Sequence, residues 1–156
     1  MDRIYMASPV GTLCLCATDK GLAEVHIVEA GEDLKEERSS PLLERAREQL
    51  KGYFEGRLRA FDLPFALEGT EFQRLVWAAL CEIPYGETAS YGEIARRIGR
   101  SKAVRAVGGA NHNNPLAIVV PCHRVIGSDG RLVGYGGGLD VKQWLLDHER
   151  RHALPL

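Results

Sequence analysis

The chain has 156 residues, of which 45% are hydrophobic and 26% charged, and its formal net charge at pH 7 is -1. These values are ordinary for a soluble globular protein and argue against a disordered chain. No segment approaches the ~18 uninterrupted apolar residues that a membrane-spanning helix needs, and the N-terminus lacks the regions of a secretion signal. We therefore predict a cytoplasmic or nuclear protein without membrane contact, nucleoid-associated if it is prokaryotic and built from one or two small domains.

The net charge hides a difference between the two halves of the chain. Residues 1–68 carry a charge of -4, whereas residues 69–156 carry +3 and four of the five histidines. A polyanion such as nucleic acid would therefore bind the second half. The four cysteines form no CxxC pair, which argues against a zinc knuckle or a thioredoxin-like motif. Cys14 and Cys16 share one face of an expected strand, so a strained disulfide between them stays open.

Residues 1–68 have the pattern of a small α/β domain. Apolar and polar residues alternate over the first 30 positions, and "SPVG" and "TDKG" indicate turns between antiparallel strands. Ser40 and Pro41 suit the N-cap and the first position of a helix that continues to about Phe54. The stretch "FDLPFALEGT" is then predicted to be the extended linker to a second domain, residues 69–156.

The second half is predicted to be mainly helical. Thr70 and Gln73 fit a capping box at the start of a helix that ends before "IPYGE". The short helix "YGEIARRIG", the turn "GRS" and the helix "KAVRAVGGANHNN" then have the shape of a helix-turn-helix, although an ordinary helical hairpin fits the same pattern.

The second helix of this pair is predicted to have a basic face and a packing face. The basic face comprises Lys102, Arg105, Gly109 and His112, and the packing face comprises Ala103, Val104, Val107 and Ala110. A basic face of this kind suits either phosphate groups or plain solvent.

The stretch "VVPCHRVIG", residues 119–127, contains the candidate reactive centre. We predict that "LAIVV" is a buried strand ending at Pro121, which places Cys122 just past it. A free thiol is a weak nucleophile near pH 7 and needs a base or a cation beside it. In an extended chain His123 points away from Cys122, so it would act through a bridging water. Glu149, at the edge of the apolar face of the helix "DVKQWLLDHE", could orient that histidine, although each of these residues taken alone is more commonly structural.

Four segments resemble the O6-alkylguanine-DNA alkyltransferase family: "NNPLAIVVPCHRVIG", "VRAVGGA", "IPYGE" followed by "SYGEIA", and "GYGGGLDVKQWLLDHE". The resemblance implies an α+β fold, with a ribonuclease H-like domain (1–68) followed by a mostly helical winged helix-turn-helix DNA-binding domain (69–156). It also implies DNA repair by direct reversal, in which an alkyl group moves irreversibly from O6-alkylguanine to Cys122. Each protein molecule would act once.

The resemblance also assigns roles to residues of the reactive centre. Cys122 is the alkyl acceptor, His123 the base acting through water, and Glu149 the carboxylate that orients the histidine. Asn114 braces the active-site turn. Tyr91 protonates the leaving group and pushes the 3′ phosphate.

The partner implied is double-stranded DNA carrying O6-alkylguanine, whose alkylated base must be extruded from the duplex. The second helix of the helix-turn-helix would enter the minor groove regardless of sequence, with Arg105 filling the space of the flipped base. Other expected contacts with the DNA backbone come from Tyr91, Gln73, Arg100 and Ser128. The pocket for the base would be lined by Tyr135, Gly136 and Val125. Some family members have serine at the place of Gly136, so we expect a roomier pocket that accepts bulky adducts such as benzyl.

The family resemblance leads us to expect a monomer without a metal or cofactor. Some members bind zinc near the N-terminus, but Thr18 and Ala23 stand here in two of the four ligand places. Three other functions remain to be separated from alkyl transfer: a lesion-binding protein without an acceptor, a transcription regulator, and a cysteine hydrolase. The presence of Cys122 argues against the first, and we expect no regulatory domain.

Overall fold

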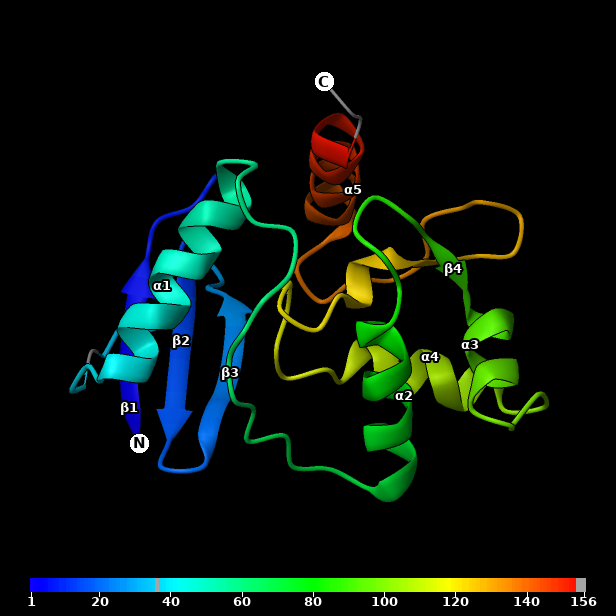
Figure 1. The fold of residues 1–156 in the computed structure, drawn as a ribbon, viewed down its shortest axis with the longest axis horizontal. Coiled ribbons are helices and arrows are strands. Elements are labelled where there is room, and N and C mark those ends of the chain that lie inside the picture. The colour runs from blue at the N-terminus through cyan, green and yellow to red at the C-terminus, as the bar shows by residue number, and fades with distance from the viewer. Residues whose placement is uncertain (36, 154–156) are drawn as a thin grey trace. The chain divides into compact units, whose positions relative to one another are not determined.

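The computed structural model describes residues 1–35 and 37–153. The chain forms two compact units, one made of Met1–Glu68 with Pro115–Val119 and the other of Gly69–Asn114 with the chain from Val120 onward. The first unit contains a sheet with one helix and the second is mostly helical, which confirms the predicted α+β class (Figure 1). Within the described residues, no helix has both the length and the apolar character needed to cross a membrane.

The first unit is built on a three-stranded antiparallel sheet in the order β1 (Asp2–Met6), β2 (Leu13–Thr18), β3 (Gly21–Ile27). Helix α1 (Pro41–Phe54) lies across one face of this sheet (Figure 1). Ser40 begins the helix as predicted, because its hydroxyl accepts a hydrogen bond from the N–H of Leu43. The core between them contains Leu15, Leu43, Leu50 and Tyr53, and each fully buried leucine contributes about 1.5–3 kcal/mol of burial free energy.

The segment 115–119 differs from its prediction as a strand. Leu116 forms only an isolated parallel bridge with Val25 of β3. The chain then turns sharply at Ile118, which has φ 71°, and the N–H of Val119 donates to the carbonyl of Ala117 at 2.8 Å. A β-branched residue rarely adopts this conformation. An apolar run of five residues suits a buried turn as well as a buried strand, and the sequence pattern alone does not separate them.

The second unit begins with three packed helices: α2 (Glu71–Cys81), α3 (Tyr91–Arg97) and α4 (Val104–His112). The predicted capping box of Thr70 and Gln73 is present, and Ser90 with Glu93 forms a second one at the start of α3. The indole N–H of Trp77 in α2 donates to the carbonyl of Ala110 in α4 at 2.9 Å. Helices α3 and α4 are the two helices of the predicted helix-turn-helix.

Helix α4 corrects one detail of the prediction. It begins at Val104, so Lys102 and Ala103 precede its first turn. Val107 and Ala110 are buried as expected, but Val104 is 42% exposed. The helix is shorter at its N-terminus than the sequence pattern suggested, which leaves Val104 at the solvent-facing start of the first turn.

The rest of the second unit carries the candidate reactive residues. Strands β4 (Ala89–Ser90) and β5 (Val125–Ile126) pair in parallel, and one turn of 3-10 helix, η1 (Cys122–Arg124), directly precedes β5. Helix α5 (Leu139–Ala153) follows after a loop and packs against η1.

Candidate active site

Cys122 lies at the start of η1 and is 6% exposed. The chain around it was predicted to be extended, but it is a tight turn in which the N–H of Cys122 donates to the carbonyl of Val120 at 2.8 Å. Burial raises the pKa of the Cys122 thiol. The side chain of Asn114, the charge of Lys142 and the N–H groups of Cys122 and His123 act in the opposite direction. The net rise means that the resting form is the neutral thiol.

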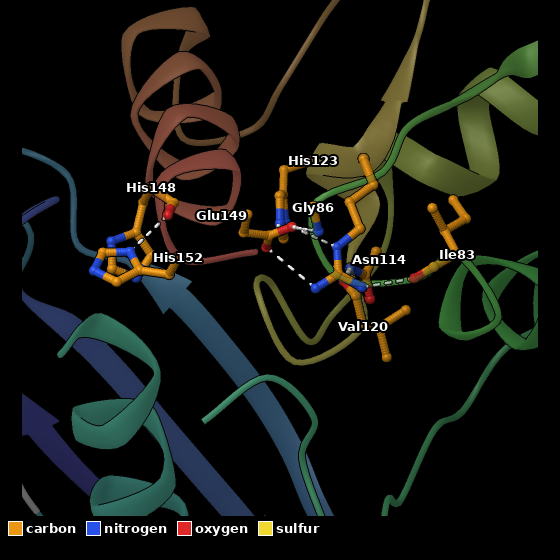
Figure 2. A network of polar contacts seen from close by, with 9 residues as sticks. Ile83, Gly86, Asn114, Val120, His123, His148, Glu149 and His152 are labelled. Carbon is orange, nitrogen blue, oxygen red and sulfur yellow. Dashed lines mark hydrogen bonds and ion pairs between the residues drawn. The ribbon is translucent and has the colours of Figure 1, made fainter. Parts of the chain in front are cut away.

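His123 and Glu149 form a buried pair at the centre of the site, as Figure 2 shows. The His123 Nε2 to Glu149 Oε2 distance is 2.6 Å, and both side chains are almost completely excluded from solvent. Glu149 also accepts a hydrogen bond from the N–H of Gly86 at 3.2 Å. Helix α5 therefore carries the carboxylate into the interior, which the sequence analysis expected of Glu149.

Arg124 is the cationic partner of Glu149. Its Nε donates to Glu149 Oε1 at 2.8 Å and its Nη2 to Oε2 at 3.2 Å, while Nη1 donates to the carbonyl of Ile83 at 2.7 Å. Burial by itself raises the pKa of Glu149, but the hydrogen bonds and charges of His123 and Arg124 together hold that pKa well below its usual range. Glu149 is therefore an ionised carboxylate throughout the neutral range.

The ionised Glu149 determines which nitrogen of His123 carries a proton. Burial lowers the pKa of His123, so the ring is neutral near pH 7. A carboxylate only accepts hydrogen bonds, so the proton sits on Nε2 and the lone pair on Nδ1. His123 Nδ1 is buried and has no hydrogen-bond partner among the residues that the structure describes. The arrangement leaves His123 with a free basic nitrogen beside Cys122 in the chain.

Two asparagines, one in the last turn of α4 and one just after the helix, hold the turn that carries Cys122. Asn114 donates from Nδ2 to the carbonyl of Val120 at 2.9 Å, the contact expected of a residue that braces the turn. Asn111 donates from Nδ2 to the carbonyl of Cys122 at 3.3 Å, and sequence reasoning missed it. One signal was available, because Asn111 lies four residues after Val107 on the packing face of the helix, where a polar side chain is unexpected.

Lys142 is the second residue that sequence reasoning missed. It is fully buried, and its Nζ donates to the carbonyls of Val125 at 2.6 Å, Val133 at 3.1 Å and Gly134 at 3.4 Å. Burial lowers its pKa, while the thiol group of Cys122 acts to raise it. The hydroxyl of Tyr91 donates to the same Val133 carbonyl at 2.9 Å. Lys142 and Tyr91 therefore both hold the loop that precedes α5.

The predicted pocket residues lie on β5 and on this loop. Val125 is buried, and its carbonyl is already bonded to Lys142. The hydroxyl of Tyr135 is buried without a hydrogen-bond partner within the described residues, and burial raises its pKa well above the usual value, with further contributions from Cys122 and Glu149. Gly136 is exposed, and a Cβ atom added there would meet nothing within 4 Å.

The predicted DNA-facing residues lie on several parts of the second unit, with Tyr91 at the start of α3. Arg105 is exposed on α4, Arg100 is exposed just before that helix, and Ser128 is exposed just after β5. Gln73 lies at the start of α2, where its side-chain oxygen accepts a hydrogen bond from the N–H of Thr70 at 3.0 Å. Their contact with DNA stays a prediction.

In the part of the chain that the structure describes, no group of three or more His, Cys, Asp or Glu side chains converges as a metal site would require. All four cysteines are free thiols.

Comparison with known proteins places these features in one family. The ribonuclease-like domain of 6-O-methylguanine DNA methyltransferase matches residues 1–67, and the DNA-binding domain of the same protein matches residues 71–151. The methylated-DNA–protein-cysteine methyltransferase of Mycolicibacterium paratuberculosis is 53% identical over 152 residues, which cover 94% of this chain and 90% of the relative. The protein of the same name from Methanosarcina barkeri is 48% identical over 149 residues, covering 93% and 94% of the two chains.

The solved structures agree with the sequence comparison. The crystal structure of Mycobacterium tuberculosis OGT in complex with DNA is similar with a TM-score of 0.90 and 45% identity, and the match covers 97% of this chain and 94% of the other. The crystal structure of Mycobacterium tuberculosis O6-methylguanine methyltransferase also has a TM-score of 0.90, with 44% identity and coverage of 99% and 96%. Because these similarities span both units and nearly every residue, the chain belongs to the 6-O-methylguanine DNA methyltransferase family.

Proposed function

We propose that this protein repairs alkylated DNA by direct reversal, moving the alkyl group from the O6 atom of guanine to the sulfur of Cys122. The observation that carries the proposal is the buried row of Cys122, His123 and Glu149. In this row the carboxylate fixes the proton of His123 on Nε2 at 2.6 Å, and Nδ1 is left without a partner among the described residues. The family membership and the names of its relatives support the same activity.

The first step is activation of the thiol. The resting Cys122 holds its proton, because burial raises its pKa. His123 Nδ1 takes this proton through a bridging water, and the resulting imidazolium is stabilised by the Glu149 carboxylate that faces Nε2. The charge of Lys142 and the side chain of Asn114 favour the thiolate that forms.

The second step is the transfer itself. The thiolate of Cys122 attacks the alkyl carbon, so a carbon–sulfur bond forms while the bond from that carbon to O6 breaks. The electron pair stays on the guanine, which takes a proton from the hydroxyl of Tyr91 and becomes an ordinary base again. Burial raises the pKa of Tyr91, so its hydroxyl is protonated before the transfer. The thioether is stable, so each molecule acts once.

The substrate must reach the sulfur of Cys122, a residue that is only 6% exposed, which no base inside a duplex can do. We therefore place α4 in the minor groove of double-stranded DNA, with exposed Arg105 in the space left by the extruded nucleotide. Arg100, Gln73 and Ser128 would contact the backbone, which carries no sequence information and suits a repair protein. The flipped base would lie against Tyr135, Gly136 and Val125, and the protein would act as a monomer.

Intact-protein mass spectrometry after incubation with duplex DNA containing O6-methylguanine tests the proposal. The expected result is a gain of one methyl group on Cys122, with the reaction stopping near one equivalent. Cys81→Ser, which changes an exposed thiol, should react like the parent protein, whereas Cys122→Ser should not react. An unchanged mass would indicate a lesion-binding or regulatory protein, and many turnovers per molecule would indicate a hydrolase.

A further inference from the structure

Two thiols that the proposed reaction does not use lie side by side in β2. Cys14 and Cys16 are both at most 1% exposed, and their sulfur atoms are 3.7 Å apart. Residues two apart in a strand point to the same face, so the pair belongs to one face of the sheet. Both thiols are free.

The surroundings of the pair are polar rather than apolar. Tyr5 and His26 are the cross-strand neighbours of Cys14, and Arg3 and Glu24 are those of Cys16. The Nε of Arg3 donates to the sulfur of Cys16 at 3.3 Å. Burial raises the pKa of Cys14 to about 12, with a further contribution from the neighbouring sulfur. The sulfur of Cys16 therefore accepts a hydrogen bond from a guanidinium, and the two thiols lie on a sheet face with polar neighbours.

The chain after β3 covers this face through contacts that are partly exposed. His26 Nε2 is 2.9 Å from Glu32 Oε2, the N–H of Lys35 donates to the hydroxyl of Tyr5 at 3.1 Å, and Arg3 is 3.3 Å from Glu37. His26 lies on β3, whereas Tyr5 and Arg3 lie on β1. The residues that contact them therefore reach across β2, the central strand that carries the thiols. Ion pairs of this kind are weakened by water, and segments held by them open locally before the rest of the fold. The thiols thus lie on the face of the sheet that these partly exposed contacts cover.

The geometry favours a single atom bonded to both sulfurs over a disulfide bond between them. Two residues apart in a strand, the Cα atoms are about 6.6 Å from each other, at the far end of the range that a disulfide allows. The sulfurs would have to approach from 3.7 Å to a bond length of about 2.05 Å, which requires backbone movement. An atom that bonds to both sulfurs needs no such approach. Soft centres prefer thiolate ligands, and trivalent arsenic is such a centre, so it suits two sulfurs that are 3.7 Å apart.

We propose that Cys14 and Cys16 form a dithiol site for trivalent arsenicals. With an aryl arsenoxide, two arsenic–sulfur bonds form, the arsenic–oxygen bond breaks, and the oxygen leaves as water with the two thiol protons. Neither sulfur nor arsenic changes its oxidation state, so no oxidant is needed. The site lies in the N-terminal unit and is independent of the alkyl transfer proposed for Cys122.

The probe is phenylarsine oxide, added in one equivalent to the native protein, followed by intact-mass measurement and tryptic mapping. Trypsin releases residues 4–20 as one peptide that contains Cys14 and Cys16 but neither of the other cysteines. The expected result is one bridging phenylarsenic group on this peptide, removed by a small dithiol but not by an equal amount of a monothiol. This measurement uses the wild-type protein, so it does not depend on whether a variant folds.

Variants sharpen the test. Cys14→Ser and Cys16→Ser should each lose the dithiol-sensitive adduct, whereas Cys81→Ser and Cys122→Ser should keep it. An adduct found on the Cys81 or Cys122 peptide, or one that forms on residues 4–20 only in denaturant, overturns the proposal. The mass of the adduct is measured without any alkyl transfer. A missing adduct therefore leaves the proposed repair function standing, and a protein that fails to transfer the alkyl group can still form the adduct.

Discussion

Replacing Glu149 with glutamine probes the centre of the site. One oxygen of Glu149 accepts from His123 and Arg124, and the other accepts from Arg124 and from the N–H of Gly86. A glutamine side chain must turn its NH₂ group toward one of these two sets, so donors face donors in either orientation. The buried guanidinium of Arg124 also loses its counter-ion. Removing one partner of a buried ion pair costs about 3–5 kcal/mol.

Arg124 keeps its bond to the carbonyl of Ile83, which places the expected loss toward the lower end of that range. For a chain of this size, about 3–5 kcal/mol corresponds to a drop in melting temperature of roughly 6–20 °C. Urea denaturation at pH 7 measures the free energy of unfolding directly. The matched control is Asp147→Asn on the same helix, because Asp147 is exposed and its carboxylate is 4.0 Å from Arg150; it should leave stability almost unchanged.

The stability difference between wild type and Glu149→Gln should depend on pH. The folded-state pKa of Glu149 lies below its unfolded value of about 4.3, so the stability that its charge contributes is present above that value and is lost as the pH falls below it. The difference between wild type and Glu149→Gln should therefore be full at pH 7 and shrink in acid. The rate of alkyl transfer should also fall at pH 7, because the imidazolium of His123 loses its stabilising charge. A loss of stability below 1 kcal/mol, or an unchanged transfer rate, would refute this account of the buried row.

Three further substitutions test the loop, the pocket and the DNA contact. Lys142→Met removes a group that donates hydrogen bonds to three carbonyls and a charge that lowers the Cys122 pKa. Alkyl transfer should therefore slow, and its pH profile should move to higher pH. An unmoved profile contradicts an electrostatic effect of Lys142 on the thiol. Gly136→Ser has room for its side chain, so stability should change by no more than about 0.5 kcal/mol, while the rate for O6-benzylguanine should fall relative to O6-methylguanine; a constant ratio contradicts the roomier pocket. Arg105→Ala should slow repair of duplex DNA about tenfold or more, since base extrusion costs a few kcal/mol, yet leave transfer from free O6-benzylguanine unchanged. Equal losses on both substrates would place Arg105 in the chemistry instead.

The features that could be predicted from the sequence depend on neighbouring residues. The capping boxes at Thr70 and Ser90 and the N-cap at Ser40 need residues within three positions, and the first and last of these were predicted correctly. Glu149 could be placed near the interior because a helix fixes which of its residues share a face. The family resemblance of the cysteine segment supplied the assignment of roles that local pattern left open.

The features that were missed depend on contacts between distant segments. Residues 116–120 are apolar in any arrangement, and only the bridge to Val25 and the turn at Ile118 decide that they are not a strand. Lys142 looked like a solvated residue of α5, since the carbonyls that bind it come from β5 and the preceding loop. Its position three residues before Leu145 and seven before Glu149 placed it on the buried face, a conflict of polarity that points to a buried role.

The carbonyl of Val133 accepts from both Tyr91 and Lys142, and this sharing has a thermodynamic consequence. If Tyr91 turns toward a phosphate or toward the guanine, Val133 keeps only the lysine, and the loop before α5 loses one of two anchors. The hydrogen bond given up is worth about 0.5–1.5 kcal/mol, so DNA binding is weakened by that amount and loop opening is favoured by the same amount. The affinity for DNA and the opening of this loop are therefore linked through Tyr91, and a substitution of Tyr91 should change both.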